Sequence, residues 1–249
     1  MKLDDYINTL EQEGERFAAA AAERPLDTPV PTCPAWSIRD LMQHLGTVHR
    51  WATTVVAGAI PKPSAVPQDF AGSMPADVSL HDWYRDGHAA LVATLRSTDP
   101  DTACFTFLAD PPPPLTFWAR RQAHETSMHR LDAELATTVT TPFETELAAD
   151  GIDEILTGFA PRKYTPLHSD RPTTLQVVPV DADGVWTMTI SADAPATVRA
   201  AQDADCTVRG HASDLLRALW NRADVAALTI DGDPAVLAMF RDSVKVQWS

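Results

Sequence analysis

The sequence predicts an α+β protein, with an antiparallel four-helix bundle over residues 1–165 and a small α+β domain over residues 166–249. Two observations support this prediction. Apolar residues recur at helical spacing in four long segments of the first two thirds, and from Thr173 onward the hydrophobic pattern changes to a period of two. The proline-containing segment "APRKYTPLHSDRP" (160–172) separates the two patterns, so we place the domain boundary there.

Four segments are expected to form the bundle. The first covers residues 4–24 and stops before a proline. The second is expected to begin after Ser37, where Asp40 completes an acidic variant of the capping box, and to end at Gly58. Four long helices favour an antiparallel bundle, and a fifth helix is expected to pack on its end. The remaining helices of this part are expected over residues 79–97, 115–136 and 146–159.

The last third predicts strands, with two further helices. Two alternating runs, 174–180 and 185–191, flank "DADG" and indicate a β-hairpin. An amphipathic helix is expected after Ser213 as its cap, and a closing helix from Pro234, a residue favoured in the first turn. Further strands are expected at 196–200, 206–210 and 227–233.

Composition narrows the class of partners. With 20 Lys and Arg against 34 Asp and Glu, the formal net charge of −14 disfavours nucleic acid and anionic lipid. The sequence has no stretch of roughly 20 apolar residues and its N-terminus lacks a signal-peptide pattern, so a cytoplasmic protein without a membrane partner is expected. Three irregularly spaced cysteines predict neither disulfides nor a cysteine zinc site. The expected assembly is a monomer or a homodimer.

One helical segment carries metal-ligand side chains. In "ARRQAHETSMHRLDAE" (119–134), Glu125 and His129 lie four residues apart, so both can reach one ion from a single helix face. His124 and His129 are five apart and point roughly 140° away from each other, which excludes the two-histidine chelate of zincin proteases. A carboxylate and an imidazole remain, which suit zinc or another divalent transition metal.

The second predicted helix offers a candidate for a third ligand. Its apolar stripe runs from Leu41 to Val55, and His44 lies at the edge of this stripe, whereas His49 is turned about 140° away from His44. Metal sites in bundles use inward side chains of facing helices, which makes His44 a candidate. On these grounds alone a second interpretation stands beside it. His44 would bond a core carboxylate or backbone group, and the Glu–His pair would lie on a helix surface.

Longer motifs resemble one known family. The motifs are "CPAWSIRDLMQHLGTVHRWA", "RRQAHETSMHRLDAELA", "ELAADGIDEIL" and "LLRALWNRADVAALTIDGDPA". Together they resemble the mycothiol-dependent maleylpyruvate isomerase family over nearly the whole chain. This resemblance implies a DinB-like four-helix bundle in the N-terminal domain and a smaller α+β C-terminal domain.

The resemblance also implies a site. In that family the metal is held by a histidine eight residues after the tryptophan of the first motif and by the Glu-x-x-x-His of the second, which are His44, Glu125 and His129 here. It implies zinc or another divalent transition metal, and mycothiol, as cofactors. It further implies a catalytic arginine in the C-terminal domain, here Arg222. For this arginine the alternative is a guanidinium that caps the end of a helix.

A site with three protein ligands has an open fourth position, which is typical of catalytic zinc. With the resemblance, we expect a metal- and mycothiol-dependent enzyme in which a zinc-activated low-molecular-weight thiolate adds to an electrophilic small molecule. One alternative is a mycothiol S-transferase of detoxification or biosynthesis. Another is a non-catalytic protein that binds a metal or a ligand.

Four neighbours of the candidate ligands complete the prediction. Trp36 is expected to close the start of the second helix as a hydrophobic staple, and the alternative is that it lines an entrance. Arg121, one turn before Glu125, is interpreted as a partner of that carboxylate, a contact for an anionic substrate or a surface arginine. His49 and His124 are expected at the rim of the site.

Overall fold

A computed structural model describes residues 1–108, 110–137, 139–163 and 165–245 of the chain. The chain divides into two compact units, each described here by itself. The division follows Thr141, whereas the sequence pattern suggested a boundary after residue 165, so the helix expected over residues 146–159 is part of the second unit. The first unit comprises Met1–Phe107 and Pro111–Thr141, and the second comprises Leu108–Asp110 and Pro142–Ser249.

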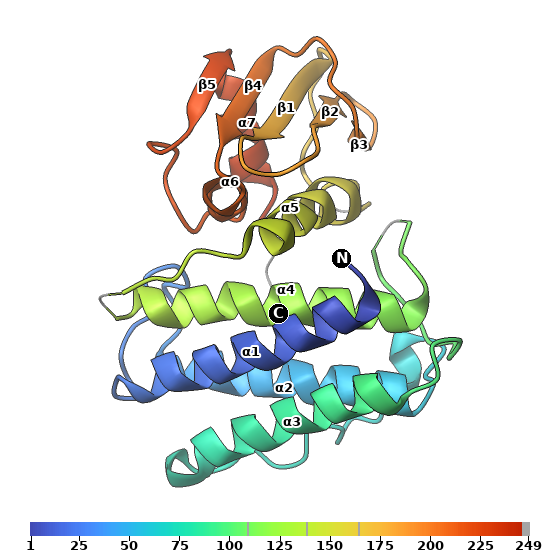
Figure 1. The fold of residues 1–249 in the computed structure, drawn as a ribbon, viewed down its shortest axis with the longest axis vertical. Helices are drawn as coiled ribbons and strands as arrows, with labels where there is room; N and C mark the ends of the chain where they lie inside the picture. Colours follow the sequence, from blue (N-terminus) through green and yellow to red (C-terminus); the bar gives the residue numbers. More distant parts are fainter. Residues whose placement is uncertain (109, 138, 164, 246–249) are drawn as a thin grey trace. The chain divides into compact units, whose positions relative to one another are not determined.

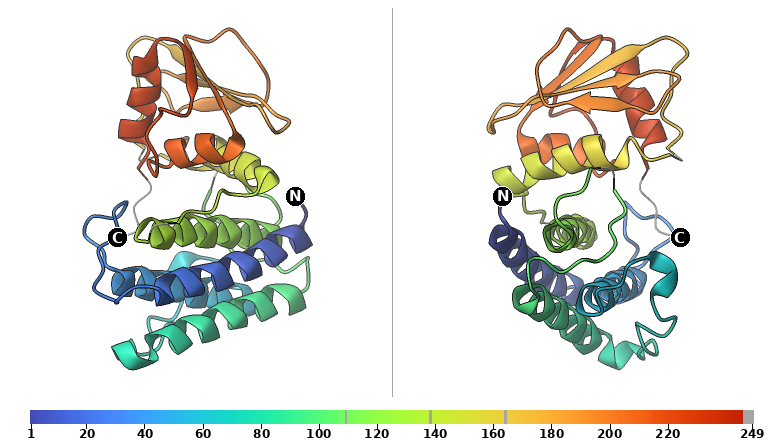
Figure 2. Two further views of the ribbon diagram at one scale, coloured as in Figure 1. Left: turned by 60° about the vertical axis from the view of Figure 1, so that its left-hand side comes forward. Right: turned by 90° about the vertical axis from the view of Figure 1, so that its right-hand side faces the viewer.

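The first unit is a bundle of four long helices (Figure 1). Its core is formed by apolar side chains that recur on the inward faces of the helices, among them Phe17, Leu41, Leu45 and Tyr84. The views in Figure 2 show the four helices side by side. Their bounds are α1 (Leu3–Ala22), α2 (Ile38–Ala57), α3 (Leu80–Ser97) and α4 (Pro114–Leu135).

The helix directions differ in part from a simple antiparallel bundle. Helix α1 is antiparallel to α3, and α2 is antiparallel to α4, but α1 runs parallel to α4 because Tyr6 meets His124 and Glu13 meets Arg130. Helices α2 and α3 are also parallel. The cause is the long connection over residues 58–79, which carries the chain back to the other end of the bundle before α3 begins.

The start of α2 is fixed as the sequence predicts. The Ser37 hydroxyl accepts a hydrogen bond from the Asp40 backbone N–H, and Asp40 Oδ2 accepts one from the Ser37 backbone N–H at 2.8 Å. This capping box is confirmed, as is the end of the helix at Gly58. The cap matters for function because it sets where the following turns of α2, including His44, face the bundle interior.

The second unit is a five-stranded mixed sheet with helices. The strand order is β3-β2-β1-β4-β5, in which β1 and β4 are parallel and the other neighbours are antiparallel. The predicted hairpin is confirmed, with Val177 opposite Trp186. The strands are β1 (Thr173–Pro179), β2 (Trp186–Ile190), β3 (Ala196–Val198), β4 (Cys206–Gly210) and β5 (Thr229–Gly232).

Helices α6 and α7 pack against β1 and β4 and against each other. One predicted cap is wrong: His211 is the N-cap residue of α6, and Ser213 lies inside the helix, where its hydroxyl accepts a hydrogen bond from the Phe143 backbone N–H. The bounds are α5 (Thr145–Asp153), continued by a π-helical turn (Glu154–Phe159), α6 (Ala212–Leu219) and α7 (Pro234–Ser243). The mixed sheet and helices of this unit, with the helical first unit, confirm the α+β class.

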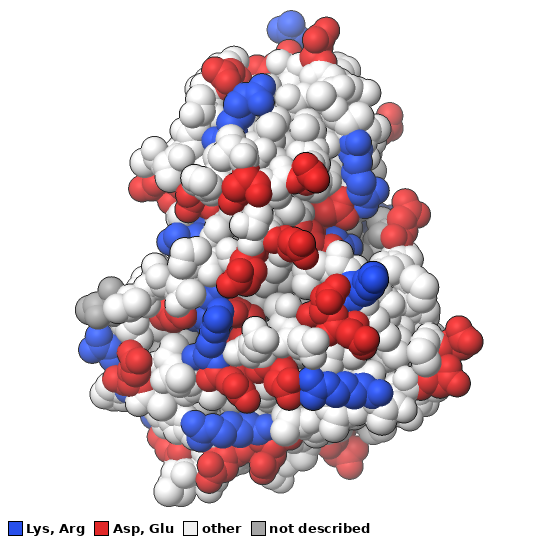
Figure 3. All heavy atoms as spheres, viewed as in Figure 1, with Lys and Arg blue, Asp and Glu red and all other residues white. Residues whose placement is uncertain are grey.

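The surface agrees with the acidic composition. On the face shown in Figure 3, acidic side chains lie among basic ones over both units, and no continuous basic area is visible among the described residues. Within the described part of the chain, no helix is long and apolar enough to cross a membrane.

Candidate metal centre

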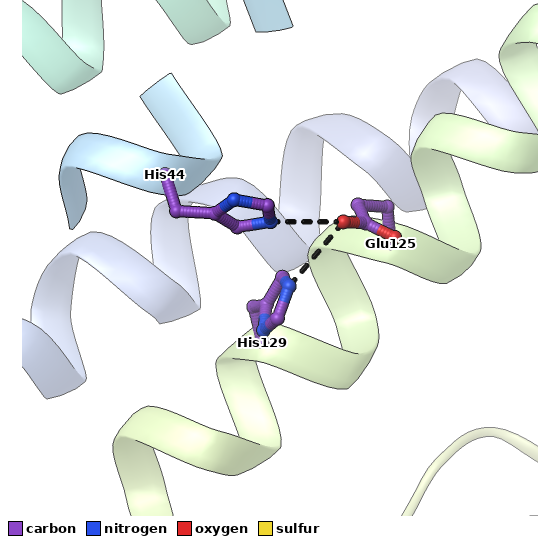
Figure 4. Close-up of side chains that lie close together, drawn as sticks. All are labelled: His44, Glu125 and His129. Atoms are coloured by element: carbon purple, nitrogen blue, oxygen red, sulfur yellow. Dashed lines mark hydrogen bonds and ion pairs between the residues drawn. The ribbon is translucent and has the colours of Figure 1, made fainter. Parts of the chain in front are cut away.

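Three side chains from two antiparallel helices converge inside the bundle (Figure 4). His44 on α2 places Nε2 3.2 Å from Oε1 of Glu125 on α4, and Nε2 of His129, one turn further along α4, lies 3.3 Å from the same oxygen. The three ligand atoms lie within 4.8 Å of one another. Among the described residues, no other group of three His, Cys, Asp or Glu side chains has this geometry. The structure thus brings together the three residues that the sequence selected.

The two distances to Glu125 Oε1 and the chemistry of these side chains suit a divalent transition metal. Zinc bound tetrahedrally at about 2.0–2.2 Å from nitrogen and oxygen ligands separates those ligands by about 3.3–3.5 Å. The two separations to Glu125 Oε1, 3.2 and 3.3 Å, are close to this value. Two imidazoles and one carboxylate also form a donor set that divalent transition metals favour. A metal at this place would therefore be held by His44, Glu125 and His129, with a further position open.

Glu125 is held in place from its other side. Arg121, one turn earlier on α4, donates a hydrogen bond from Nη2 to Glu125 Oε2 at 3.0 Å, and both side chains are buried. Burial by itself would raise the pKa of Glu125, but the imidazoles of His129 and His44 and the charge of Arg121 hold it well below its usual value. The carboxylate is therefore ionised and oriented. The structure supports the interpretation of Arg121 as a partner of the Glu125 carboxylate. Its burial excludes the interpretation as a surface arginine.

His129 has a carboxylate partner that the sequence reasoning missed. Its Nδ1 donates to Asp132 Oδ2 at 2.9 Å, and the Asp132 side chain is fully buried. Burial alone would lower the pKa of His129, but the Asp132 and Glu125 carboxylates raise it to about 9. A carboxylate on the far nitrogen fixes the tautomer that presents Nε2 to a metal. The signal was present in the sequence as a carboxylate three residues after the histidine, on the same helix face.

Trp36 lies at the site rather than only at the helix start. Its ring centroid is 4.7 Å from that of His44 and 6.0 Å from that of His129. The indole is partly exposed and also packs against the apolar core of the bundle. The staple interpretation was therefore incomplete, because Trp36 also forms a wall beside two of the three candidate ligands.

The expected rim positions of His49 and His124 are wrong. Both side chains are buried, and His49 is fully inaccessible. His49 Nε2 lies 2.9 Å from Thr126 Oγ1, next to Glu125 in sequence, and its ring is 5.5 Å from that of His88 on α3. The sequence of α2 shows a single apolar stripe, but α2 contacts both α3 and α4, so two of its faces are buried. Neither histidine is part of the three-residue group.

Burial of His49 predicts an effect of pH on stability. Burial lowers the pKa of His49 well below its usual value, and His88 adds to this. In the unfolded chain the pKa of this histidine is about 6.5. A histidine that stays neutral in the folded state therefore lowers the stability of the protein as the pH falls below that value. We expect the double variant His49→Leu, Thr126→Val to lose less free energy of unfolding than the wild type between pH 7 and pH 5. The two losses should differ by about 1.4 kcal/mol per pH unit below about 6.5.

Urea unfolding of both metal-free proteins at several pH values would measure this difference. The contribution of His129 is common to both proteins and cancels. His168→Leu, at an exposed histidine of the second unit, is the control and should follow the wild type. Identical pH dependence of the double variant and the wild type would contradict the assignment.

Arg222 follows α6 in the second unit. Its Nη1 donates to the Trp220 backbone carbonyl at 3.1 Å, and its backbone N–H donates to the Arg217 carbonyl at 2.7 Å. Asn221 between them has a positive φ of 57°, a common way to end a helix. These contacts agree with the helix-capping interpretation, and the side chain is partly exposed. A catalytic role for Arg222 stays a prediction.

Comparison with known proteins agrees with both units. Residues 7–134 match the family model of the mycothiol maleylpyruvate isomerase N-terminal domain, and residues 146–239 match that of the MDMPI C-terminal domain. The crystal structure of the mycothiol-dependent maleylpyruvate isomerase is similar with a TM-score of 0.63 at 14% sequence identity, and 93% of each chain is covered. The crystal structure of a histidine-to-alanine mutant of that enzyme gives 0.64, with the same identity and coverage. No curated protein matches the sequence. At this identity the structural likeness shows the fold.

Proposed function

Because this chain belongs to the mycothiol-dependent maleylpyruvate isomerase family, we propose that it is a metal- and mycothiol-dependent enzyme that acts on an electrophilic small molecule. The observation that carries the proposal is the convergence of His44, Glu125 and His129 on one point inside the bundle. Three protein ligands leave a position for a non-protein ligand, as in catalytic rather than structural zinc sites. We propose zinc or another divalent transition metal as the ion.

When bound, a divalent ion at this site would keep a thiol deprotonated at neutral pH, where a free thiol with a pKa of about 8.5 is mostly protonated. Neighbouring residues of the protein would hold the metal ligands in position. Arg121 holds the Glu125 carboxylate by its second oxygen. Asp132 holds a proton on His129 Nδ1, so that Nε2 is the nitrogen that would give up its proton to a bound ion. Trp36 limits what can approach beside His44.

The reaction that we propose is addition and elimination. The thiolate sulfur forms a bond to one carbon of a conjugated cis double bond, and the electron pair moves to the adjoining carbonyl oxygen. The former double bond is then single and rotates. The electron pair returns, the carbon–sulfur bond breaks, and the trans product leaves with the thiol regenerated. A cis-enedioate such as maleylpyruvate is a substrate of this type. No protein nucleophile is needed.

Cobalt substitution tests the proposal. We expect cobalt-loaded protein to develop a sulfur-to-metal charge-transfer band when mycothiol is added, and the band to be absent from His44→Ala and His129→Ala. A thioether analogue of mycothiol, which has no ionisable sulfur, is the matched control. No band at saturating mycothiol, together with turnover that is unchanged when the thiol is omitted, would overturn the proposal.

The fate of the thiol distinguishes the isomerase from an S-transferase. An isomerase returns the thiol in every cycle, so the concentration of free thiol stays constant while the product accumulates. A transferase consumes one thiol per product molecule. Titration of free thiol during turnover of a panel of electrophiles therefore separates the two activities. Metal and thiol binding without turnover of any electrophile would favour a non-catalytic binding protein.

Arg222 is proposed to bind a carboxylate of the substrate. Arginine pairs with carboxylates through two parallel hydrogen bonds, so loss of the guanidinium should weaken substrate binding or its orientation. We expect Arg222→Ala to lower kcat/KM by at least about tenfold, or 1.4 kcal/mol, with the metal retained. Arg222→Lys should recover part of this loss. Unchanged kinetics in Arg222→Ala would leave only the role at the end of α6.

We further propose that the protein works in the cytoplasm with small-molecule partners. The odd number and irregular spacing of its three cysteines suit a reducing compartment. A low-molecular-weight thiol cofactor would stay reduced there.

A further inference from the structure

We propose that Asp132 is a positioning residue that joins the candidate ligand His129 to the α1–α2 loop, residues 28–37, so that metal binding and the position of this loop are coupled. The inference rests on the proposed function in one respect, namely that an ion occupies the three-residue site. It adds to the proposed function the contact of Asp132 with Thr32 in this loop, and neither residue is a ligand.

Asp132 divides its two carboxylate oxygens between two parts of the bundle. Oδ2 accepts a hydrogen bond from His129 Nδ1 at 2.9 Å on the same helix. Oδ1 accepts one from Thr32 Oγ1 at 2.5 Å, one hundred residues away in the sequence. The Cys33 thiol adds a weaker contact to Oδ2 at 3.8 Å. Hydrogen bonds to a fully buried carboxylate are costly to lose, because the charge cannot turn to water instead.

The loop is tied together by its own backbone, so that it can move as one piece. The backbone N–H of Val30 donates to the Trp36 carbonyl at 2.9 Å, and that of Ile38 donates to the Thr28 carbonyl at 3.0 Å. Within this frame, the Cys33 N–H donates to the Val30 carbonyl and the Trp36 N–H to the Cys33 carbonyl. A displacement at Thr32 is therefore transmitted to Trp36.

The other end of the loop touches the other histidine ligand. The Trp36 ring lies 4.7 Å from the His44 ring, centroid to centroid. The contacts thus connect the two histidine ligands through the loop. His129 bonds to Asp132, which accepts a hydrogen bond from the Thr32 hydroxyl in the loop. Trp36, at the other end of the loop, contacts His44. The same loop supports both imidazoles, which come from different helices.

These contacts couple metal binding to the position of the loop. An ion bound to Nε2 of His129 requires the tautomer with the proton on Nδ1, which is the donor to Asp132. A metal that fixes His129 and His44 therefore favours the loop position that satisfies both Thr32 and Trp36. Linkage is reciprocal: if the ion stabilises the docked loop by a given factor, release of the loop weakens ion binding by the same factor.

Two substitutions of one residue isolate the loop contact. Thr32→Val removes the hydroxyl with little change of shape, and Thr32→Ser keeps it. Binding of zinc alone, without thiol or substrate, is measured by chelator competition, and hydrogen exchange is followed at the bonded amides of residues 30, 33 and 36. We expect zinc to slow this exchange in the wild type. Thr32→Val should weaken zinc binding several-fold and abolish most of the zinc-dependent protection, and Thr32→Ser should restore both.

Asp132→Asn tests the junction itself. Its expected effect is a loss of zinc affinity of about 10–100-fold, the range typical for a partner of a metal-bound histidine. It should also shift the ligand-field spectrum of the cobalt-loaded protein, which a purely structural contact would not do. Thr98→Val is the matched control for Thr32→Val. It removes a hydroxyl that donates to the Thr94 carbonyl at the end of α3, and it should leave zinc affinity unchanged. If Asp132→Asn does not fold, as judged by circular dichroism, the two Thr32 variants decide the matter.

Each outcome separates this inference from the proposed function. Zinc binding by the wild type that neither slows loop exchange nor weakens in Thr32→Val would overturn the coupling and leave the proposed function standing. Failure of the wild type to bind any divalent ion would overturn both. Loss of affinity in Thr98→Val equal to that in Thr32→Val would show a general loss of stability and would also overturn the coupling.

Discussion

Replacement of His44 or His129 by alanine is expected to lower the affinity for a divalent ion by more than about 100-fold, beyond the range that changes around a ligand produce. The physical reason is that either change leaves two protein ligands, one of them the carboxylate of Glu125, which do not hold zinc firmly. We expect about one ion per chain in the wild type. Metal analysis after dialysis against a weak chelator would measure occupancy, and thiol-dependent turnover should fall with it.

His44→Ala is the cleaner of the two variants. The His44 side chain is 14% exposed, whereas that of His129 is 7% exposed and has the buried Asp132 as its partner. Loss of the His129 imidazole would therefore also affect folding. His168→Ala, at an exposed histidine of the second unit, is the control and should keep its ion. Full occupancy in both ligand variants would show that the site lies elsewhere.

Replacement of Arg130 by alanine is expected to destabilise the first unit by about 3–5 kcal/mol. The Arg130 side chain is fully buried and donates to Glu13 on α1 at 2.8 Å and to Glu134 on α4 at 2.8 Å. It also donates to the Thr141 carbonyl, just before the chain enters the second unit. Without the guanidinium, two carboxylates would remain in a largely buried position without their main countercharge. Urea unfolding at neutral pH would measure the change.

Arg16 provides a matched control for this prediction. It also pairs with Glu13, at 2.9 Å, but its side chain is 42% exposed. Exposed ion pairs contribute about 0–1 kcal/mol, so Arg16→Ala should have a small effect. Similar losses in the Arg16 and Arg130 variants would contradict the importance of burial. Arg130→Lys should recover only part of the stability, because an ammonium group cannot reproduce the planar geometry of the guanidinium.

Secondary structure followed closely from local patterns. The helices of the bundle begin and end within a few residues of the predicted bounds, because the signals are local ones such as the capping box at Ser37 and the glycine at position 58. The hairpin was predicted from its turn residues for the same reason. Helix direction was not predictable in this way. The parallel pairing of α1 with α4 depends on how residues 58–79 cross the bundle, and that connection has no periodic pattern.

Part of the candidate site was also readable from the sequence. Glu125 and His129 share a helix face by spacing alone, which is geometry that every helix imposes. His44 needed a longer argument, because its distance from α4 depends on packing. Its selection combined the apolar stripe of α2 with the family resemblance, and the structure places its Nε2 3.2 Å from Glu125.

Spacing along the chain was enough to predict the α+β class, the positions of helices and strands, and the shared helix face of Glu125 and His129. The choice of His44 also needed the family resemblance. Which polar side chains are buried depends on tertiary packing. Helix α4 buries polar residues on nearly every face, so no apolar stripe distinguishes its inner side. The partnership of Asp132 with Thr32, and that of His49 with Thr126, join residues far apart in the sequence. Such contacts arise from the packing of one helix or loop against another, and nothing in the spacing along either segment specifies them.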